Sequence, residues 1–478
     1  MTRHLWRHEW RMLRGDATLL VLIIVLTAAV GYGLVNGVRW RAHQHAVLEA
    51  ALDEEADRYK TAERTIREAR EQKKTLPAFS DPGNPDTAGR STAPRYALLP
   101  PAPLSELAVG QSDLLPNYYK VTTDSRETML GATEIENPTR LLTGRFDLAF
   151  VIVYLYPLFV IALGYNLLSL EKEQGTLALL LSQPITLTRL LAAKVGARLV
   201  LLVGLIVSLS LVALVGLGVP MAGRGALLRL GLWCAVVLGY GLFWFALSWL
   251  VTVRGRASAV NAMALAGSWL ILTILLPGAA NLLVTALYPV PSRVEMIQAV
   301  REATDDANEE GAALLGRYYQ DHPEFAAETS DQAVTDFNVV KLAVNERIEA
   351  QVRPVMQTYE VQLARQQRMI DRLRFLIPSV LVQEALNDIA GSGASRHRSF
   401  ITQVLAFHQA WRDYFYPLTV RQARLSDYAD VPQFTFIDEP LSAVVVRTAV
   451  NLTALLVLAG GLAVAGVVVL RGYAAAGE

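Results

Sequence analysis

Cysteine is almost absent from this chain of 478 residues, which contains only Cys234. That residue lies inside a long apolar segment, away from the polar parts of the sequence. A disulfide framework requires pairs of cysteines, and thiolate metal sites require several of them. The sequence therefore excludes both, and any domain outside a membrane has to fold without covalent cross-links.

Sequence motifs for nucleotide binding and hydrolysis are absent as well. There is no G-x-x-x-x-G-K-[ST] phosphate loop, no G-x-S-x-G nucleophile elbow and no H-E-x-x-H zinc pair. His43 and His45 suggest a metal site, but residues two apart do not share a helix face and no third ligand is nearby. We therefore expect that the chain is not an enzyme and holds no metal, ATP or other cofactor itself.

An excess of charge of either sign is also missing, because 44 basic residues balance 44 acidic ones. Proteins that bind nucleic acids usually gather basic residues on one face. We therefore expect no nucleic-acid partner.

What the chain has in abundance is apolar sequence, since 53% of its residues are hydrophobic and the mean hydropathy is +0.31. About 20 consecutive apolar residues cross the hydrocarbon core of a bilayer as a helix. Six segments are long enough, at residues 17–38, 146–170, 195–219, 227–251, 259–287 and 448–470. The sequence predicts an all-α polytopic membrane protein with six transmembrane helices and two mainly helical extracytoplasmic insertions.

The first apolar segment is expected to stay in the protein as an anchor. It is longer than the apolar region of a secretory signal peptide and lacks a clean small-x-small cleavage site. Residues 1–16 carry Trp6 and Trp10 among basic residues, which fits either a cytoplasmic interfacial helix or simple aromatic anchoring of the span.

Basic residues give the predicted orientation, because short cytoplasmic loops retain Lys and Arg. Such residues occur in 1–16, in 171–194, at Arg254 and Arg256, and in the tail 471–478. One topology fits them all. It is a multi-pass protein, integral to the cell (inner) membrane, with both termini in the cytoplasm.

This topology places two large segments, 39–145 and 288–440, outside the cytoplasm. The first begins with apolar residues at helical spacing over 39–74, which predicts a helical stalk. A proline-rich part over 77–116 follows and is dense in turn-forming residues.

The second insertion has a helical pattern through 293–375, with breaks expected at His322-Pro323 and Arg353-Pro354. A narrow apolar stripe within it predicts packing against the stalk or another subunit, through Phe337, Val340, Val344, Ile348 and Val352. The stretch 376–415 is amphipathic and is interrupted at Gly391-Ser392-Gly393. We expect it to fold down near the membrane surface.

Ionisable residues are nearly absent from the middles of the six apolar segments. Ion-coupled transporters usually carry such residues to bind or relay the driving ion. Their absence predicts a membrane machine that takes its energy from outside the chain.

The most informative segment is 171–194, between the second and third apolar segments. It contains Glu171, Lys172 and Glu173, then Gly175-Thr176, a leucine run over 177–181, Ser182-Gln183-Pro184 and finally Lys194. A short helix that starts with acidic residues and ends at a proline can serve as a rigid docking element for a basic cytosolic partner. The alternative is an amphipathic connector on lipid headgroups, although acidic residues are unfavourable at an anionic leaflet.

This pattern resembles the permease subunits of type-2 ABC exporters. In that family an acidic residue, Gly-Thr, a leucine-rich short helix, Ser/Thr-x-Pro and a lysine opening the third span occupy this place. The insertions are similar to those of the subgroup that includes gliding-motility and nitrous-oxide-reductase or copper maturation permeases. The segment 385–415 is similar to the pattern L-N-x-x-A-G-[ST]…R-H-x-x-F of relatives with large insertions, and Ser392 stands where Thr is common.

The resemblance implies a permease that couples ATP hydrolysis by a separate ABC ATP-binding subunit to export of a substrate. ATP and Mg would bind that partner, and a second permease copy or a sister permease would complete the complex. The docking residues would be Glu171, Lys172, Glu173, Gly175, Thr176, Leu177, Leu180 and Pro184.

The same resemblance suggests a translocation route, because the second and fifth spans tend to line the subunit interface in such relatives. Its candidate residues are Asn166, Asn261, Ser268, Thr273 and Asn281. The alternative is that these side chains bond neighbouring helices.

Polar residues near the predicted outer mouth form a further candidate site, comprising Asn387, Arg396, His397, Arg398 and His408. They would bind an anionic group on a leaving substrate or attach the insertion to membrane lipid. Structural salt bridges are the alternative role.

Two other functions are compatible with the sequence. The stalk at 39–74 favours mechanotransmission, in which ATP-driven closure acts on an envelope protein and nothing crosses the membrane. A membrane-embedded enzyme or sensor without an ATPase partner is the third, although the chain lacks a catalytic constellation.

Overall fold

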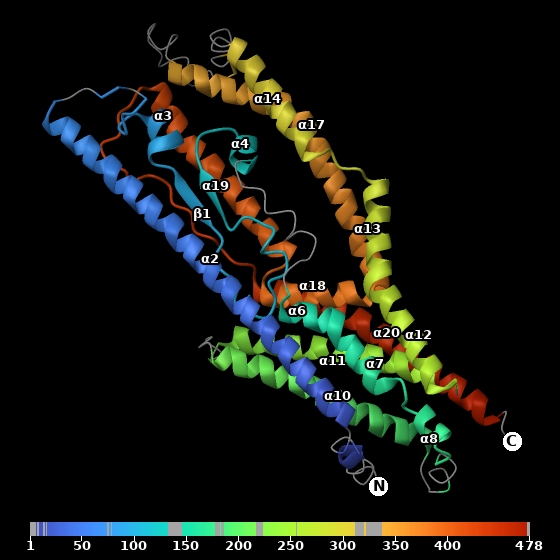
Figure 1. The fold of residues 1–478 in the computed structure, drawn as a ribbon. Helices are drawn as coiled ribbons and strands as arrows, with labels where there is room; N and C mark the ends of the chain where they lie inside the picture. The colour runs from blue at the N-terminus through green and yellow to red at the C-terminus, as the bar shows by residue number, and fades with distance from the viewer. Residues whose placement is uncertain are drawn as a thin grey trace.

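The computed structural model consists of a helical bundle and an outer part built from the two insertions (Figure 1). The start of α2 (Ala17–Glu71), α8 (Ser169–Glu173) and the last turn of α20 (Leu441–Ala475) lie at one end of the bundle. We call this the α8 end and the opposite one the insertion end. The structure describes residues 6, 9–12, 15, 17–73, 76–77, 79–131, 146–176, 182, 186–216, 223–254, 256–310, 320–321 and 337–475.

Six helices of the described chain are long and apolar enough to cross a membrane, which confirms the predicted all-α polytopic fold. Helices satisfy their backbone hydrogen bonds within the segment, as a bilayer requires. The first, third, fourth and sixth spans are α2, α10 (Leu187–Gly216), α11 (Arg224–Thr252) and α20. The second span comprises α6 (Leu148–Phe150), η2 (Val151–Leu155), α7 (Tyr156–Gly164) and α8, and the fifth comprises α12 (Ser258–Leu270), η3 (Ile271–Leu275) and α13 (Leu276–Leu287).

Helix α11 forms the centre of the bundle. It packs against α20, α7, α10, α12 and α18 (Pro378–Ala390). Its large side chains Trp233, Tyr240 and Trp244 are fully buried, so aromatic area supplies much of the core.

The first span and the predicted stalk are one continuous helix, α2, of 55 residues. No glycine or proline interrupts it after Gly37, so at 1.5 Å per residue it reaches about 80 Å. Gly33 and Gly37, one turn apart, approach the backbones of Asp147 and Glu106 too closely for any side chain. This contact fixes α2 against the second span and the first insertion.

The proline-rich part of the first insertion contains two short strands, which the sequence did not predict. β1 (Arg95–Leu98) pairs antiparallel with β2 (Tyr118–Val121), with Arg95 opposite Val121. The short helices α3 (Pro85–Thr87), η1 (Ala88–Thr92) and α4 (Arg126–Gly131) flank the hairpin.

Long-range contacts hold this hairpin region in place between α2 and α19 (Ala394–Val420). The Tyr59 hydroxyl of α2 donates to the Ala93 carbonyl at 2.8 Å, and the Trp411 indole of α19 donates to the Gly89 carbonyl at 3.0 Å. The Arg95 guanidinium lies 3.9 Å from the centre of the Tyr59 ring. The two insertions therefore share one core outside the bundle.

The second insertion forms α14 (Arg293–Glu310) and α17 (Phe337–Leu373), which pack side by side. The predicted break at Pro354 is wrong, because this residue lies inside α17. Val352 and Met356 on either side of it contact the same apolar core, which offsets a cost of roughly 3 kcal/mol for an interior proline. The predicted break at His322-Pro323 lies outside the described residues.

The apolar stripe of α17 packs against α14 and α19, and not against the stalk, which was one of the two partners that the sequence analysis named. Val344, Ile348 and Val352 share a buried cluster with Ala303 of α14 and Val420 of α19. The stripe therefore packs helices of the second insertion against one another.

Helix α18 lies across the insertion end of the bundle (Figure 1). It contacts α20, α11 and η3, and η5 (Arg374–Leu376) connects it to α17. At its end Gly391 takes a φ of +81°, a conformation that favours glycine, and the chain turns into α19.

Candidate functional site

The candidate docking segment begins at α8, where the second span ends. The Gly175 N–H donates to the Lys172 carbonyl at 3.2 Å, and the Thr176 N–H donates to the Glu171 carbonyl at 2.9 Å. This pair of bonds is the Schellman arrangement, and it needs the left-handed conformation that Gly175 adopts at φ +68°. The Gly-Thr pair is therefore the C-terminal cap of the second span.

Glu171 connects the second span to the third. Its carboxylate forms an ion pair with Lys194 of α10, whose ammonium also donates to the Leu167 carbonyl at 3.1 Å. Lys194 is only 4% exposed, so this charge depends on its partners.

Glu173 connects the second span to the fifth. Its Oε1 accepts a hydrogen bond of 2.7 Å from the backbone N–H of Ser258, in the first turn of α12. A carboxylate there satisfies a free amide and lies at the positive end of the helix dipole. The hydroxyls of Ser169 and Ser258 are also hydrogen-bonded, at 2.7 Å.

These contacts change how the predicted docking residues are interpreted. Glu171 and Glu173 tie three spans together at the α8 end, while Lys172, Gly175 and Thr176 are exposed on its surface. The remaining candidates, Leu177, Leu180 and Pro184, lie outside the described residues.

The second and fifth spans are each interrupted by a π-helical turn before a proline. η2 precedes Pro157 and η3 precedes Pro277. Proline has no N–H to donate, so each interruption leaves carbonyl groups without a partner in the helix. Both spans can therefore bend at a defined point.

Side chains from other elements satisfy the carbonyls at these interruptions. The Tyr240 hydroxyl of α11 donates to the Val153 carbonyl at 3.1 Å, and Ser379 of α18 donates to the Leu272 carbonyl at 3.0 Å. The sequence analysis missed both interruptions, although a proline inside an apolar segment was the available signal.

The candidate route residues do not converge on one site. Asn166 lies in the turn before α8, and the Asn261 amide donates to the Arg256 carbonyl at 3.4 Å. The Ser268 hydroxyl donates to the Ala264 carbonyl of its own helix at 2.8 Å. Thr273 is buried within η3, and Asn281 is exposed on α13. The hydrogen bonds of Asn261 and Ser268 stay within the fifth span and the loop before it, so they are not the bonds to neighbouring helices that the structural alternative predicted.

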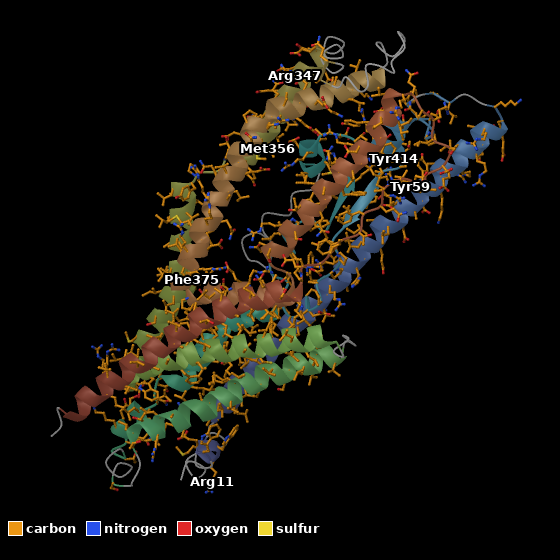
Figure 2. All side chains as sticks on the ribbon, turned by 180° about the vertical axis from the view of Figure 1, so that it is seen from behind. Arg11, Tyr59, Arg347, Met356, Phe375 and Tyr414 are labelled. Atoms are coloured by element: carbon orange, nitrogen blue, oxygen red, sulfur yellow. The ribbon has the colours of Figure 1, made fainter. Side chains whose placement is uncertain are left out.

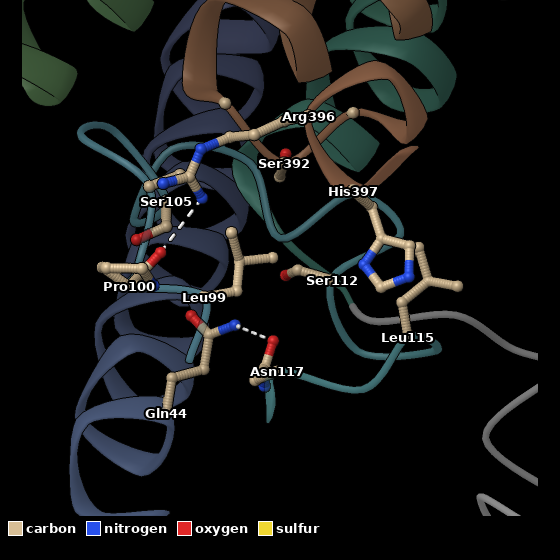
Figure 3. Close-up of a pocket in the computed structure, with 13 residues that line it drawn as sticks. Gln44, Leu99, Pro100, Ser105, Ser112, Leu115, Asn117, Ser392, Arg396 and His397 are labelled. Atoms are coloured by element: carbon tan, nitrogen blue, oxygen red, sulfur yellow. Dashed lines mark hydrogen bonds between the residues drawn. The ribbon is translucent and has the colours of Figure 1, made fainter. Parts of the chain in front are cut away.

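Arg396, in the candidate outer cluster, serves as a structural link. Its guanidinium pairs with Asp438, with Nε–Oδ1 and Nη2–Oδ2 distances of 3.0 Å. It also donates to the Pro100 carbonyl at 3.0 Å, as Figure 3 shows. It thereby joins α19 to the first insertion and to the segment before α20. Asn387 of α18 accepts from Gln383 on the same helix at 3.1 Å.

A second group of charges holds α18 to the bundle. Arg447 of α20 pairs with Asp388 at 3.0 Å and with Glu439 at 2.6 Å. Arg229 of α11 donates to the Ile389 carbonyl at 2.6 Å. The end of α18 is therefore fixed to the fourth and sixth spans.

His397 borders a small cavity between the two insertions. The cavity has a volume of about 20 Å³, enough for roughly one water, and is lined in part by Gln44, Ser112, Asn117, Ser392, Arg396 and His397 (Figure 3). Burial lowers the pKa of His397 to about 4, so its ring is neutral at physiological pH. Arg398 is exposed and does not line this cavity.

His408 lies apart from the other members of the candidate cluster. Its Nε2 is 2.9 Å from the Asp124 carbonyl, beside a cleft of about 430 Å³ between α4, α17 and α19. Ion pairs of Arg126 with Glu360 and of Arg412 with Glu349 border this cleft. The five predicted residues therefore belong to two separate places.

Residues 293–437 match the family model of a domain of unknown function, DUF3526. The match includes α14, α17, α18 and α19 and covers less than half of the chain, leaving the six spans outside. No curated protein and no solved structure matches the chain.

Proposed function

We propose that this multi-pass membrane protein is the permease subunit of an ABC exporter. The observation that carries the proposal is the α8 junction, where Glu171 and Glu173 bind the second span to the third and fifth. A separate ATP-binding subunit, which holds ATP and Mg, docks on the segment 171–184 from the cytoplasm. Movement of that segment then reaches three spans at once.

The interruptions at η2 and η3 support the same proposal. A docking force at the α8 end would act on the two spans that each contain a proline break. Bending there changes the packing of the spans without unfolding them. A second copy or a sister permease completes the complex, and both termini of each chain are cytoplasmic.

Mechanotransmission is the second candidate function, and one observation favours it. Helix α2 runs without a break from the bundle to the outer core, where Tyr59 and Glu55 contact the first insertion. In this version the helix acts on an envelope protein and no substrate crosses the membrane.

Affinity purification from the native membrane tests the docking proposal. Gly175→Ala places a side chain on a residue with a left-handed backbone conformation, which strains the cap, but the added Cβ meets no neighbouring atom. Gly267→Ala is the matched control, because Gly267 lies inside α12 and a Cβ there also meets no neighbouring atom. We expect an ATPase with a Walker motif to copurify with the wild type and with Gly267→Ala, and to be lost from Gly175→Ala. Absence of any ATPase from the gently extracted wild type would refute the proposal.

Transport and mechanotransmission are separated by a second measurement on the intact complex. An envelope protein that copurifies through the outer part, with unchanged solute content in cells lacking the permease, supports mechanotransmission. A solute that accumulates in those cells supports export.

A further inference from the structure

The corner between α17 and α18 lies at the insertion end of the bundle, outside the packed core. Figure 2 places Phe375 where the two helices meet. The Gln366 amide of α17 donates to the Tyr288 carbonyl at 2.7 Å, directly after α13, so α17 descends along the end of the fifth span. The corner therefore lies beside α13, the outer part of the fifth span.

The level of this corner relative to a bilayer follows from the charges along α18. At one end of this helix Arg374 pairs with Glu384 at 2.6 Å, and at the other Asp388 pairs with Arg447. Charged pairs of this kind belong at the boundary of the hydrocarbon core, not within it. α18 and the corner thus lie along the membrane surface on the insertion side.

The residues at the tip of the corner are apolar and exposed. Phe375 is 37% exposed and Leu376 is 66% exposed. On the adjacent α13, Leu282 and Leu287 are 70% and 54% exposed. Because Gln366 contacts Tyr288, Leu287 lies well above the tip, so the apolar surface at the corner itself is that of Phe375 and Leu376, and it matches the edge of an acyl-chain layer.

Above the tip, α17 carries a row of arginines on one exposed face. Arg365, Arg368 and Arg372 follow at spacings of three and four residues, and all are exposed. None of them pairs with a carboxylate of the part of the chain that the structure describes.

The nearby acidic residues are engaged elsewhere. Asp371 contacts Gln367 and Arg374, Glu384 pairs with Arg374, and Glu295 of α14 caps the Ser292 N–H. At 1.5 Å per residue, Arg372 and Arg368 lie about 6 Å and 12 Å above Leu376, and Arg365 about 16 Å. Arg372 is within reach of headgroup phosphates, which occupy roughly 5–8 Å outside the hydrocarbon core. The exposed Arg368 reaches them when its Nε releases the 3.2 Å hydrogen bond to the Ala364 carbonyl.

We propose that this corner is a binding surface for anionic phospholipids. Phe375 and Leu376 insert among the acyl chains, and Arg372 and Arg368 bind the headgroup phosphates. The surface anchors the second insertion to the membrane independently of what the permease transports or moves.

The test uses the full chain with Cys234→Ser, reconstituted into lipid nanodiscs. Leu376→Cys carries an environment-sensitive fluorophore, and Leu363→Cys, at an exposed position about 20 Å higher on α17, is the matched control. We expect the label at 376, but not at 363, to emit at shorter wavelength and to resist quenching by acrylamide. Equal quenching at both positions would overturn insertion of the tip.

Lipid selectivity is measured in nanodiscs that contain phosphatidylcholine with or without phosphatidylglycerol. We expect the wild type to retain phosphatidylglycerol preferentially, with the preference falling about fivefold for each of Arg368→Gln and Arg372→Gln. Arg365→Gln, farther from the surface, serves as the control and should change it less. An unchanged preference in the Arg368→Gln, Arg372→Gln double variant would overturn the assignment.

Inorganic phosphate distinguishes a lipid from a soluble ligand. Added to phosphatidylcholine nanodiscs, it should leave the fluorescence at position 376 unchanged. If phosphate instead shifts this fluorescence, or abolishes the preference for phosphatidylglycerol, the arginines bind a free anion and the lipid proposal fails.

Discussion

Trp269 of the fifth span donates its indole N–H to the backbone carbonyl of Tyr154 in the second span, at 3.0 Å. The acceptor lies within η2, and the donor lies two residues before the start of η3. The two interrupted spans are thus joined at their interruptions, so a bend in one changes the hydrogen bonding of the other.

Loss of this bond should lower stability. Trp269→Phe leaves the Tyr154 carbonyl without its side-chain donor, which costs about 1–2 kcal/mol beyond the lost packing. Trp249→Phe is the matched control, because the Trp249 indole N–H is buried and has no hydrogen-bond partner among the residues that the structure describes. Chemical unfolding in detergent measures the difference, and equal losses in the two variants would contradict the role assigned to Trp269.

The contact between the second insertion and the fifth span should behave similarly. Ser379→Ala removes the donor to the Leu272 carbonyl, and we expect the free energy of unfolding to fall by about 1–2 kcal/mol. Ser268→Ala should cost less than about 0.5 kcal/mol, because the exposed hydroxyl donates to the Ala264 carbonyl of its own helix and water can replace that bond. Hydrogen exchange around η3 provides a local readout, and faster exchange is expected only in Ser379→Ala.

The ion pair at the α8 end should show strong coupling. Lys194→Met leaves the Glu171 carboxylate without its cation and should cost about 3 kcal/mol, whereas the double variant with Glu171→Gln should lose less. Lys60→Met, which removes a pair exposed by more than three quarters on both sides, should cost no more than about 0.5 kcal/mol. Additive losses in the double-mutant cycle would show that the pair does not contribute.

Acid should destabilise the outer part through His397. Its folded pKa of about 4 lies below the ordinary value of 6.5 because burial disfavours the charged ring. Between these values the unfolded chain binds more protons, so stability is complete above pH 6.5 and decreases as the pH falls toward 4.

Thermal unfolding between about pH 7 and pH 4.5 measures this effect. His397→Gln should reduce the slope, and the exposed His45→Gln should leave it unchanged. Burial also lowers the pKa of His408, so part of the slope will remain in His397→Gln. An identical slope in wild type and His397→Gln would contradict the prediction.

Properties that depend on local sequence were predictable. Apolar length identified the six spans, and helical spacing identified the stalk, because both reflect neighbours within one segment. The turn at Gly391 was also visible, since glycine suits a positive φ.

The remaining features depend on residues far apart in the sequence. Glu173 was predicted to meet a partner protein, yet its acceptor oxygen binds the N–H of Ser258, 85 positions away. Trp411 donates a hydrogen bond to the carbonyl of Gly89, 322 positions earlier in the sequence, and no local pattern predicts that bond. Pro354 was taken for a helix end because its cost is local, whereas the packing that offsets it comes from α14 and α19.

The unbroken length of α2 makes it a lever arm. A rigid rod multiplies a small rotation at one end into a larger displacement at the other, so a tilt of about 5° over roughly 80 Å moves its far end by about 7 Å. The hairpin and the core around Tyr59 are attached to that far end. A rearrangement too small to open the bundle would therefore still shift the outer part by more than the width of a peptide strand.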